Sequence, residues 1–388
     1  MKKFFFLFLL FPLLQYSQVK NYIPYRDGNL WGFCNEQKQI LIKPQFTSAL
    51  FFSCGMSRVK LDISDKWAFI DTTGDVRFYL FNYDYGYGFE RDSLALVNIG
   101  GQISPIGVYI GGNWGFINTL GELVIDTKYN QCGNLSEGLR GVNLGSKYNS
   151  LGWMEGGKWG FIDSKGNEVI PNSYDDVGEF HENLVKVNSN GLWGFIDKKN
   201  KKTIAFIYEE AGNFSEGLAP VKFNGKWGYI DKGGKIIINC KYDNAKEFSE
   251  GFAAVRVNKN MGFINKKGAT VIEIKYDAVN SFSNGLASVE LNKKFGFINK
   301  KGEIIIALKY DLADDFSEGF AIVAEGEIKI ENSGIKDLRK YGVINKLGEI
   351  IIPFKYESIQ PFKNDYSFVL YNRKLGVINK NGSEYWNN

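Results

Sequence analysis

The sequence contains one histidine, His181, and only four cysteines among its 388 residues. A single histidine excludes zinc sites built from several histidines. None of the cysteines (Cys34, Cys54, Cys132 and Cys240) belongs to a C-x-x-C pair, which argues against zinc or redox motifs. Cys34 and Cys54 share the first of the repeats described below, so they are the best-placed pair for a disulfide in an oxidising compartment. The simpler interpretation is that all four are small buried side chains.

A strong excess of charge is also absent. Lys and Arg number 47 against 43 Asp and Glu, and without Lys2 and Lys3 the count is 45 against 43. Nucleic-acid binding needs a concentrated basic field, so we expect no nucleic-acid partner. The hydrophobic content of 44% is ample for a folded core.

Only the N-terminus carries a long apolar run. Lys2 and Lys3 precede Phe4 to Leu14, and the small residue Ser17 follows at a plausible cleavage point. This pattern predicts a signal peptide over residues 1–17 and export to the periplasm or the extracellular space. A membrane anchor is the alternative, but the run is shorter than the roughly 20 residues that span a bilayer. We therefore expect no membrane-spanning segment after cleavage.

The rest of the chain is repetitive. The stretch from Gly225 to Val255, GKWGYIDKGGKIIINCKYDNAKEFSEGFAAV, recurs about ten times, and the last copy is truncated. Its Trp-Gly glycine, or a replacement, falls at Gly32, Ala68, Gly115, Gly160, Gly194, Gly228, Gly262, Gly296, Gly342 and Gly376. A period of this size indicates an array of stacked units. From Trp31 to Gly382 the units resemble the WG-containing repeat (WG β-repeat) family, which is defined by its repeat and has no common activity.

Each repeat predicts three short strands. Strand A is the Ala-x-Val segment (Ala253 to Val257), strand B the Trp-Gly segment (Lys226 to Asp231) and strand C the Ile-rich segment (Lys235 to Asn239). The predicted fold is therefore all-β, with residues 18–388 forming a tandem array of three-stranded antiparallel β-meanders. Because the two ends look like caps, we favour an open curved superhelix over a closed propeller. Tyr385 and Trp386 are expected to cover the last unit.

Two turns in the repeat predict positive φ angles. The turn between strands B and C closes with Gly268 or Gly302, and Asn200 replaces this glycine once. The loop after strand C, Phe-Ser-Glu-Gly, ends in Asn183 or Asp365 in two copies. Asparagine and aspartate are the residues that best tolerate this conformation after glycine.

The aromatic residues at repeated positions are interpreted as core. The Trp position also holds Met261, Phe295, Tyr341 and Leu375, and an aliphatic side chain fills a core but cannot stack on a ligand. Gly228 is expected to allow close approach by an adjoining unit. The predicted repeat core comprises Trp31, Trp67, Trp114, Trp159, Trp193, Trp227, Phe214, Phe248, Phe282 and Phe316.

Three repeats are longer than the others, and each time the extra residues lie between strands A and B. Insertions on one edge of a repeat protein often mark its binding side, although tolerated hairpin extensions are an equal alternative. The ligand-contact candidates in the insertions are Tyr109, Tyr148 and Trp153. Tyr85 and Tyr87, in the unique stretch NYDYGYGF, form either a further contact patch or a flexible cap.

No catalytic, cofactor or metal residues are predicted. The acidic pairs Asp175-Asp176, Glu209-Glu210 and Asp314-Asp315 are taken to recur in the same loop, which indicates turn formation rather than one catalytic site. A hydrolase would have to use Asp176, His181 and Glu182. Lysines in the B–C turns, such as Lys232 and Lys266, predict a basic stripe that keeps the edges soluble or, less simply, holds an anionic polymer.

The sequence therefore favours an exported, non-catalytic repeat protein, a binding or scaffold module of the bacterial envelope. Its expected partner is an unidentified protein or glycan, and no cofactor is expected. A passive structural spacer is the alternative, and an envelope hydrolase is a weaker one.

Overall fold

The computed structural model describes residues 22–61, 66–103, 109–148, 154–331 and 334–387. Regular structure in these residues consists of β-strands alone, which confirms the all-β repeat fold. The chain divides into two compact units, residues 1–173 with 387–388, and residues 174–386. Within the described residues there is no helix long and apolar enough to cross a membrane. The predicted signal peptide, residues 1–17, lies outside the described residues, and the open course of the array stays a prediction.

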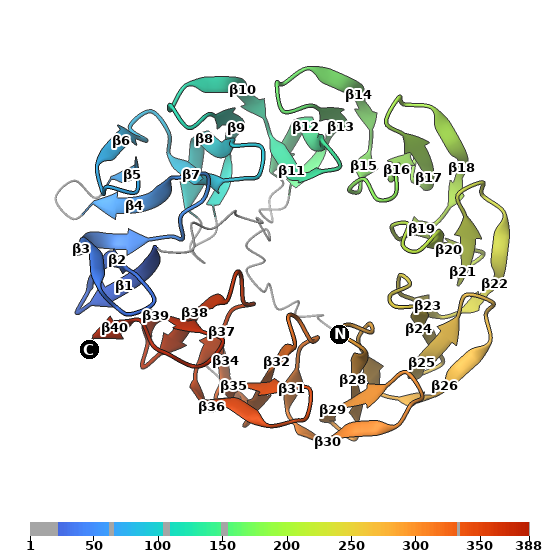
Figure 1. The fold of residues 1–388 in the computed structure, drawn as a ribbon. Helices are drawn as coiled ribbons and strands as arrows, with labels where there is room; N and C mark the ends of the chain where they lie inside the picture. Colours follow the sequence, from blue (N-terminus) through green and yellow to red (C-terminus); the bar gives the residue numbers. More distant parts are fainter. Residues whose placement is uncertain (1–21, 62–65, 104–108, 149–153, 332–333, 388) are drawn as a thin grey trace. The chain divides into compact units, whose positions relative to one another are not determined.

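The second unit is the more regular one and shows how the repeat folds (Figure 1). Its first four sheets each have four antiparallel strands in chain order. Their strands are β15 (Asp176–Val177), β16 (Leu184–Ser189), β17 (Leu192–Asp197), β18 (Lys202–Tyr208); β19 (Glu210–Ala211), β20 (Leu218–Phe223), β21 (Lys226–Asp231), β22 (Ile236–Tyr242); β23 (Asn244–Ala245), β24 (Phe252–Val257), β25 (Asn260–Asn265), β26 (Thr270–Tyr276); β27 (Ala278–Val279), β28 (Leu286–Leu291), β29 (Lys294–Asn299) and β30 (Ile304–Tyr310).

Three further sheets complete this unit. In the lengthened repeat, a separate two-stranded hairpin, β33–β34, lies between strands A and B of the main sheet. The four-stranded sheet and its hairpin are formed by β31 (Leu312–Ala313), β32 (Phe320–Glu325), β33 (Ile328–Glu331), β34 (Gly334–Asp337), β35 (Lys340–Asn345) and β36 (Ile350–Tyr356). The last sheet has three strands, β37 (Ser358–Ile359), β38 (Tyr366–Tyr371) and β39 (Lys374–Asn379), and the short strand β40 (Trp386–Asn387) follows it in the chain.

The predicted three-stranded meander is present in every regular sheet, and a fourth strand extends it. In the β19–β22 sheet the added strand is β19, whose Ala211 pairs with Val221. It comes from the loop that follows strand C of the preceding repeat. Each repeat therefore contributes strands to two sheets, which ties neighbouring sheets together covalently.

The glycine of the Trp-Gly pair has no room for a side chain, because strand C of the same sheet lies directly against it. Trp227 pairs with Tyr242 and Tyr229 with Ile238, so residues 239–241 bulge opposite Gly228. A Cβ atom on Gly228 would lie 2.5 Å from the carbonyl oxygen of Ile238 and 2.7 Å from the amide nitrogen of Cys240. The expectation that this glycine admits an adjoining unit is therefore wrong, because the close contact lies within the sheet.

Both turns adopt the predicted conformation. Gly268 and Gly302 have φ angles of 78° and 81°, and Asn200, which replaces them, has 62°. Asn183 and Asp365 at the end of the Phe-Ser-Glu-Gly loop have 68° and 74°. These values confirm that the positions are selected for positive φ.

Neighbouring sheets pack face to face through apolar side chains. Tyr229 and Ile238 of one sheet lie in a single core cluster with Val255 and Ile264 of the next sheet. Phe248, from the loop between the two sheets, is 1% exposed in the same cluster. Both faces of a central sheet are therefore buried, as expected for stacked layers.

The end of the second unit is covered by its own aromatic residues. Tyr385 is 1% exposed and Trp386 is 8% exposed. The ring of Tyr385 lies 5.6 Å from that of Tyr366, and Trp386 lies against Gly376, where other sheets place strand C. Tyr385 and Trp386 thus cover the last sheet, as expected.

The first unit follows the same plan with longer hairpins. Strands β1 to β6 form consecutive antiparallel pairs, and β7–β10 and β11–β14 form two four-stranded sheets. The strands are β1 (Ile23–Asp27), β2 (Leu30–Cys34), β3 (Ile40–Ala49), β4 (Ser57–Leu61), β5 (Trp67–Ile70), β6 (Val76–Tyr79), β7 (Tyr85–Phe89), β8 (Ala95–Ile103), β9 (Tyr109–Ile117), β10 (Leu123–Tyr129), β11 (Gln131–Ser136), β12 (Leu139–Tyr148), β13 (Met154–Ile162) and β14 (Glu168–Tyr174).

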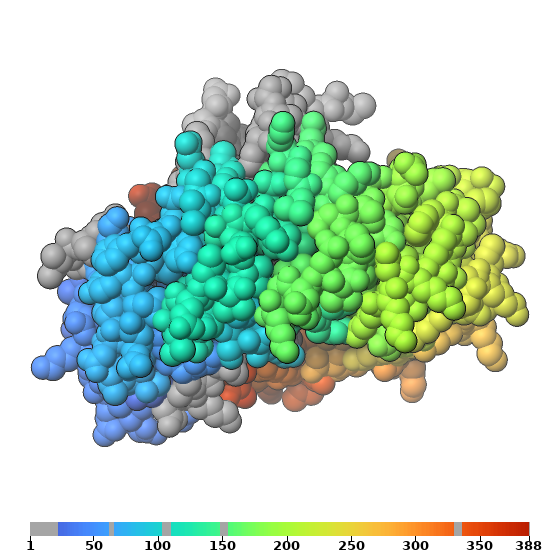
Figure 2. Space-filling model, turned by 90° about the horizontal axis from the view of Figure 1, so that it is seen from above, coloured from blue at the N-terminus to red at the C-terminus, as the bar shows by residue number. Residues whose placement is uncertain are grey.

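The predicted insertions lengthen the A–B hairpins β8–β9 and β12–β13. Figure 2 shows both hairpins rising from the same edge of the unit. At their base, the Asn130 side chain donates to Asn113 Oδ1 (3.1 Å) and accepts from the Gly145 amide (2.7 Å), which links β9 to β12. The two long hairpins therefore stand next to each other.

Candidate functional site

Two of the predicted contact residues lie at the outer ends of strands in the long hairpins. Tyr109 begins β9 and Tyr148 ends β12. The side chains of both fall outside the described part of the structure, as does the whole of Trp153. Their role as contact residues stays a prediction.

Tyr85 and Tyr87 lie in an ordered strand, β7, so the interpretation of their segment as a flexible cap is wrong. Their rings meet edge to face with centroids 5.0 Å apart. The Tyr87 ring lies 5.8 Å from that of Trp114 on β9 of the same sheet. Burial and the neighbouring Tyr85 hydroxyl raise the pKa of Tyr87 to about 12, so its hydroxyl stays protonated at neutral pH.

A residue that sequence reasoning missed, Arg58 of β4, joins this cluster to the neighbouring sheet. The Arg58 guanidinium lies 4.2 Å from the centre of the Trp67 ring and 5.0 Å from that of Tyr85. We call the continuous series Trp67, Arg58, Tyr85, Tyr87 and Trp114 the aromatic strip. Its four rings are all half-buried, so part of each remains accessible. The strip could not be predicted, because it joins residues of two different sheets.

The second unit carries a simpler counterpart. Lys186 occupies the strand A position equivalent to Arg58, and its ammonium group lies 5.5 Å from the centre of the Trp193 ring. Lys186 also donates a hydrogen bond of 2.9 Å to the carbonyl of Ala211. Both units thus place a cation above a Trp-position ring. Of Arg58 and Lys186, only Arg58 also lies over a second ring, that of Tyr85, in the described part of the structure.

The repeated aromatic positions differ in burial. Among the predicted core residues the four phenylalanines are 1–2% exposed. Trp31 and Trp227 are buried, whereas Trp67, Trp114, Trp159 and Trp193 are half-buried. The phenylalanine is therefore the deeper anchor of the repeat, and some of the Trp positions keep an accessible edge.

The first residue caps an A–B hairpin in two of the three acidic pairs. Asp175 accepts a 2.6 Å hydrogen bond from the Asn190 amide, and Glu209 accepts one of 3.1 Å from the Gly225 amide. In the eighth repeat this place belongs to Asp311, which bonds the Gly326 amide at 2.9 Å. These are the turn-forming roles expected for acidic residues in this loop.

The prediction that Asp314-Asp315 occupies the same loop position as the other acidic pairs is wrong. It lies after the two-residue strand β31, three residues beyond the capping position. Both side chains are accessible at the surface. Partial dehydration by the surrounding protein and repulsion from Asp315 raise the pKa of Asp314 to about 6.

Glu182, one of the residues considered for a hydrolase, has a structural role. Its carboxylate accepts hydrogen bonds of 3.1 and 3.2 Å from the Gly217 amide and pairs with Lys232 at 3.0 Å. The Asp176 carboxylate bonds the adjacent Val177 amide at 2.8 Å. The lysine of the B–C turn is thus one member of a link between sheets rather than part of an unoccupied basic stripe.

A buried ion pair replaces this link in the first unit. Arg140 on β12 contacts Glu90 through two parallel bonds of 3.0 and 2.9 Å and also reaches Asp92 at 3.2 Å. Burial raises the pKa of Glu90 more than the guanidinium lowers it. The arrangement shows how this fold accommodates a buried arginine when its role is structural.

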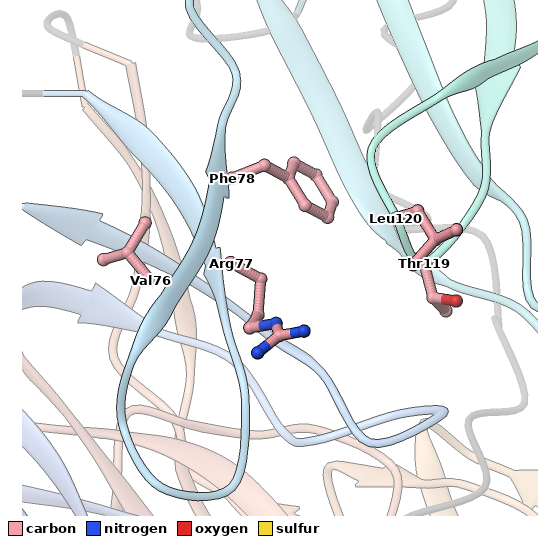
Figure 3. A pocket seen from close by; sticks show the side chains of 5 residues that line it. All are labelled: Val76, Arg77, Phe78, Thr119 and Leu120. Carbon is pink, nitrogen blue, oxygen red and sulfur yellow. The ribbon is translucent and has the colours of Figure 1, made fainter.

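The cysteines and the surface hollows offer little chemistry. The four cysteines are unbonded thiols, and burial raises the pKa of Cys34 and Cys132 to about 12, so neither is a reactive thiolate. A hollow of about 170 Å³ lies between Phe78 of β6 and Leu120 of the β9–β10 turn (Figure 3). This volume is below the roughly 300 Å³ of ordinary ligand pockets. The described residues contain no group of three potential metal ligands.

Several solved structures resemble the chain at low sequence identity. A structure titled as the eukaryotic initiation factor shares 11% identity, with 95% of each chain covered and a TM-score of 0.49. Hsv2 of Kluyveromyces lactis shares 9% over 66% of this chain and 94% of its own, with a TM-score of 0.39. The extracellular domain of a putative one-component system from B. thetaiotaomicron shares 11% over 96% and 64%, with a TM-score of 0.34. No curated protein matches the sequence.

The sequence also matches a family model, described as the WG containing repeat, nine times. The matched segments are residues 31–67, 67–102, 114–148, 159–193, 193–227, 227–260, 261–295, 295–327 and 341–374. Each segment runs from one Trp position to the next, so a segment such as 193–227 contains strands B and C of one sheet and the first two strands of the following sheet. Together the segments cover most of the chain. The chain therefore belongs to the WG containing repeat family.

Proposed function

We propose that this protein is an exported, non-catalytic binding module of the bacterial envelope that contacts a protein or a polysaccharide through its first unit. The observation that carries this proposal is the aromatic strip, whose four half-buried rings are connected by ring contacts and by the Arg58 guanidinium. Partly exposed aromatic rings are enriched where proteins bind partners, because they bury a large area and lose little conformational freedom.

The long hairpins support the same surface. Trp114 pairs with Asn98 at the point where β8 and β9 extend beyond the other strands. The strip therefore lies at the base of the first hairpin, and the second hairpin stands beside it. Insertions on one edge of a repeat array are where such proteins commonly place their contacts.

The absence of a catalytic role is part of the proposal. Glu182, Asp175 and Glu209 hold backbone amides, so the acidic groups considered for hydrolysis are engaged in turns and links between sheets. Export rests on the N-terminal pattern of residues 1–17. If the wild-type protein shows activity in a hydrolase assay, the variants His181→Ala and Asp176→Asn test this site. Full activity of both variants would exclude His181 and Asp176 as catalytic residues.

The test is a capture experiment with the protein lacking residues 1–17. It is immobilised and exposed to solubilised envelope fractions at about 0.05 M and about 0.5 M salt. We expect saturable retention of a component by the wild type and its loss in the double variant Tyr85→Ser, Tyr87→Ser. The control is Tyr371→Ser in the second unit. Retention that is never saturable, or that the double variant keeps in full, would support a passive spacer instead.

A further inference from the structure

Arg58 has an unusual environment for a charged side chain. It is 5% exposed, and its Nε and Nη1 atoms are buried without a hydrogen-bond partner. Its contacts are the faces of Trp67 and Tyr85. Within the described residues no acidic group forms an ion pair with it.

Arg140 in the same unit is a buried arginine whose charge is compensated by acidic partners. That side chain is 3% exposed and bonds Glu90, Asp92 and the Gly133 carbonyl while it also lies 4.5 Å from the Phe116 ring. Burying a charge without a partner is strongly unfavourable, and stacking on aromatic rings offsets only part of this. Among the described residues, therefore, no carboxylate neutralises the charge of Arg58.

We infer that the aromatic strip binds an acidic glycan, a chain of uronate-type sugars, with the Arg58 charge attracting a carboxylate to the rings. This inference rests on the binding role proposed above and adds the class of ligand. The accessible parts of the rings suit the apolar faces of sugar rings. The Arg58 guanidinium is buried, so it attracts a carboxylate through its uncompensated field rather than through a direct contact. Asp84 precedes Tyr85 in the chain, and its carboxylate accepts a hydrogen bond of 2.6 Å from the Gly100 amide and forms no ion pair with Arg58 among the described residues.

The shape of the strip favours a linear polymer over a compact molecule. The contacts run from Trp67 through Arg58, Tyr85 and Tyr87 to Trp114, across two neighbouring sheets. The Tyr87 hydroxyl, protonated at neutral pH, can donate to sugar oxygens. An acidic peptide would be attracted by the same charge, so it is the competitor that the experiment must separate.

The experiment is calorimetric titration of the protein lacking residues 1–17 with galacturonate, glucuronate and guluronate oligosaccharides. A neutral gluco-oligosaccharide and an oligo-aspartate peptide of matched length are the comparison ligands. The key variant is Arg58→Met, which keeps an apolar side chain between Trp67 and Tyr85. The matched control is Lys186→Met, at the equivalent position above Trp193 in the second unit.

We expect at least one uronate oligosaccharide to bind, and Arg58→Met to weaken it by about tenfold or more. Arg58→Met should also raise the temperature of unfolding, because it removes an unpaired buried charge. Lys186→Met should leave the affinity unchanged. Equal affinity in Arg58→Met, destabilisation by it, peptide binding as tight as glycan binding, or no binding of any uronate would overturn the inference. Saturable capture of an envelope component alongside no uronate binding would leave the proposed function intact.

Discussion

The carboxylate of Glu216 accepts hydrogen bonds of 3.2 and 3.1 Å from the backbone amide of Gly251, 35 residues further along the chain. Both residues occupy the same loop in successive repeats, and Lys266 of the next sheet completes the contact at 3.0 Å. The same link joins Glu182 to Gly217 and Glu250 to Gly285. The first four sheets of the second unit are thus linked in series by a repeated polar contact in addition to their apolar cores.

Removing this link should destabilise the protein. Glu216→Ala leaves the Gly251 amide without its acceptor and removes the carboxylate that pairs with Lys266, although Lys266 keeps its 3.0 Å hydrogen bond to the carbonyl of residue 216. We expect a loss of about 1–2 kcal/mol in the free energy of unfolding. Lys267→Ala, in the same turn, should change it by no more than about 0.5 kcal/mol. Urea unfolding measures both variants, and an equal effect of the two would show that the link contributes nothing.

The link should also depend on pH. Burial tends to raise the pKa of Glu216, but its bonds to Lys266 and Gly251 outweigh this and lower the pKa below the ordinary value. A lowered pKa in the folded state gives stability that is present above the unfolded value of about 4.3 and is lost as pH falls through the folded value. The wild type should therefore be more stable than Glu216→Gln at pH 6, and the difference should shrink below about pH 4. A difference that grows in acid would contradict this.

His181 takes the place of a serine that has a repeated structural role. Ser215 donates a 2.6 Å hydrogen bond to the Phe248 carbonyl of the next repeat, and Ser249 donates one of 2.7 Å to Phe282. We expect Ser215→Ala to cost about 1 kcal/mol and His181→Ser to stabilise the protein by a similar or smaller amount. Thermal unfolding of the two variants tests this, and a destabilising His181→Ser would show that the imidazole has a role of its own.

The Trp-Gly glycine should not tolerate a methyl group. In Gly228→Ala the new Cβ meets backbone atoms of strand C, so the sheet must shift, at a cost of about 2–3 kcal/mol. The second repeat offers the reverse experiment. There Ala68 pairs with Tyr79 and Phe69 with Phe78, without the bulge that faces Gly228. Ala68→Gly should therefore cost only about 0.5–1 kcal/mol, and equal costs for the two variants would contradict the explanation.

The sequence allowed good prediction of features that depend on local chemistry. Positive φ at Asn200 and Asn183, and the long hairpins before Trp114 and Trp159, follow from turn residues and spacing. The two-residue strands such as β19 were missed, since two residues carry no periodicity. The prediction that Gly228 faces an adjoining unit was wrong, because the alternation of apolar and polar residues does not reveal the bulge in strand C that lies against it. Arg58 was missed because its environment exists only once two sheets have packed.

The repeat structure depends on each sheet burying its faces against its neighbours. Tyr229 and Phe248 are buried at 0% and 1% exposure by residues from two sheets, and one sheet alone cannot cover them. The direct measurement is circular dichroism and urea unfolding of the isolated segment 209–242 beside the full protein. If neighbours share the burial, the segment is unfolded and shows no cooperative transition, whereas the full protein shows one. A cooperatively folded 209–242 segment would contradict the claim that each sheet depends on its neighbours.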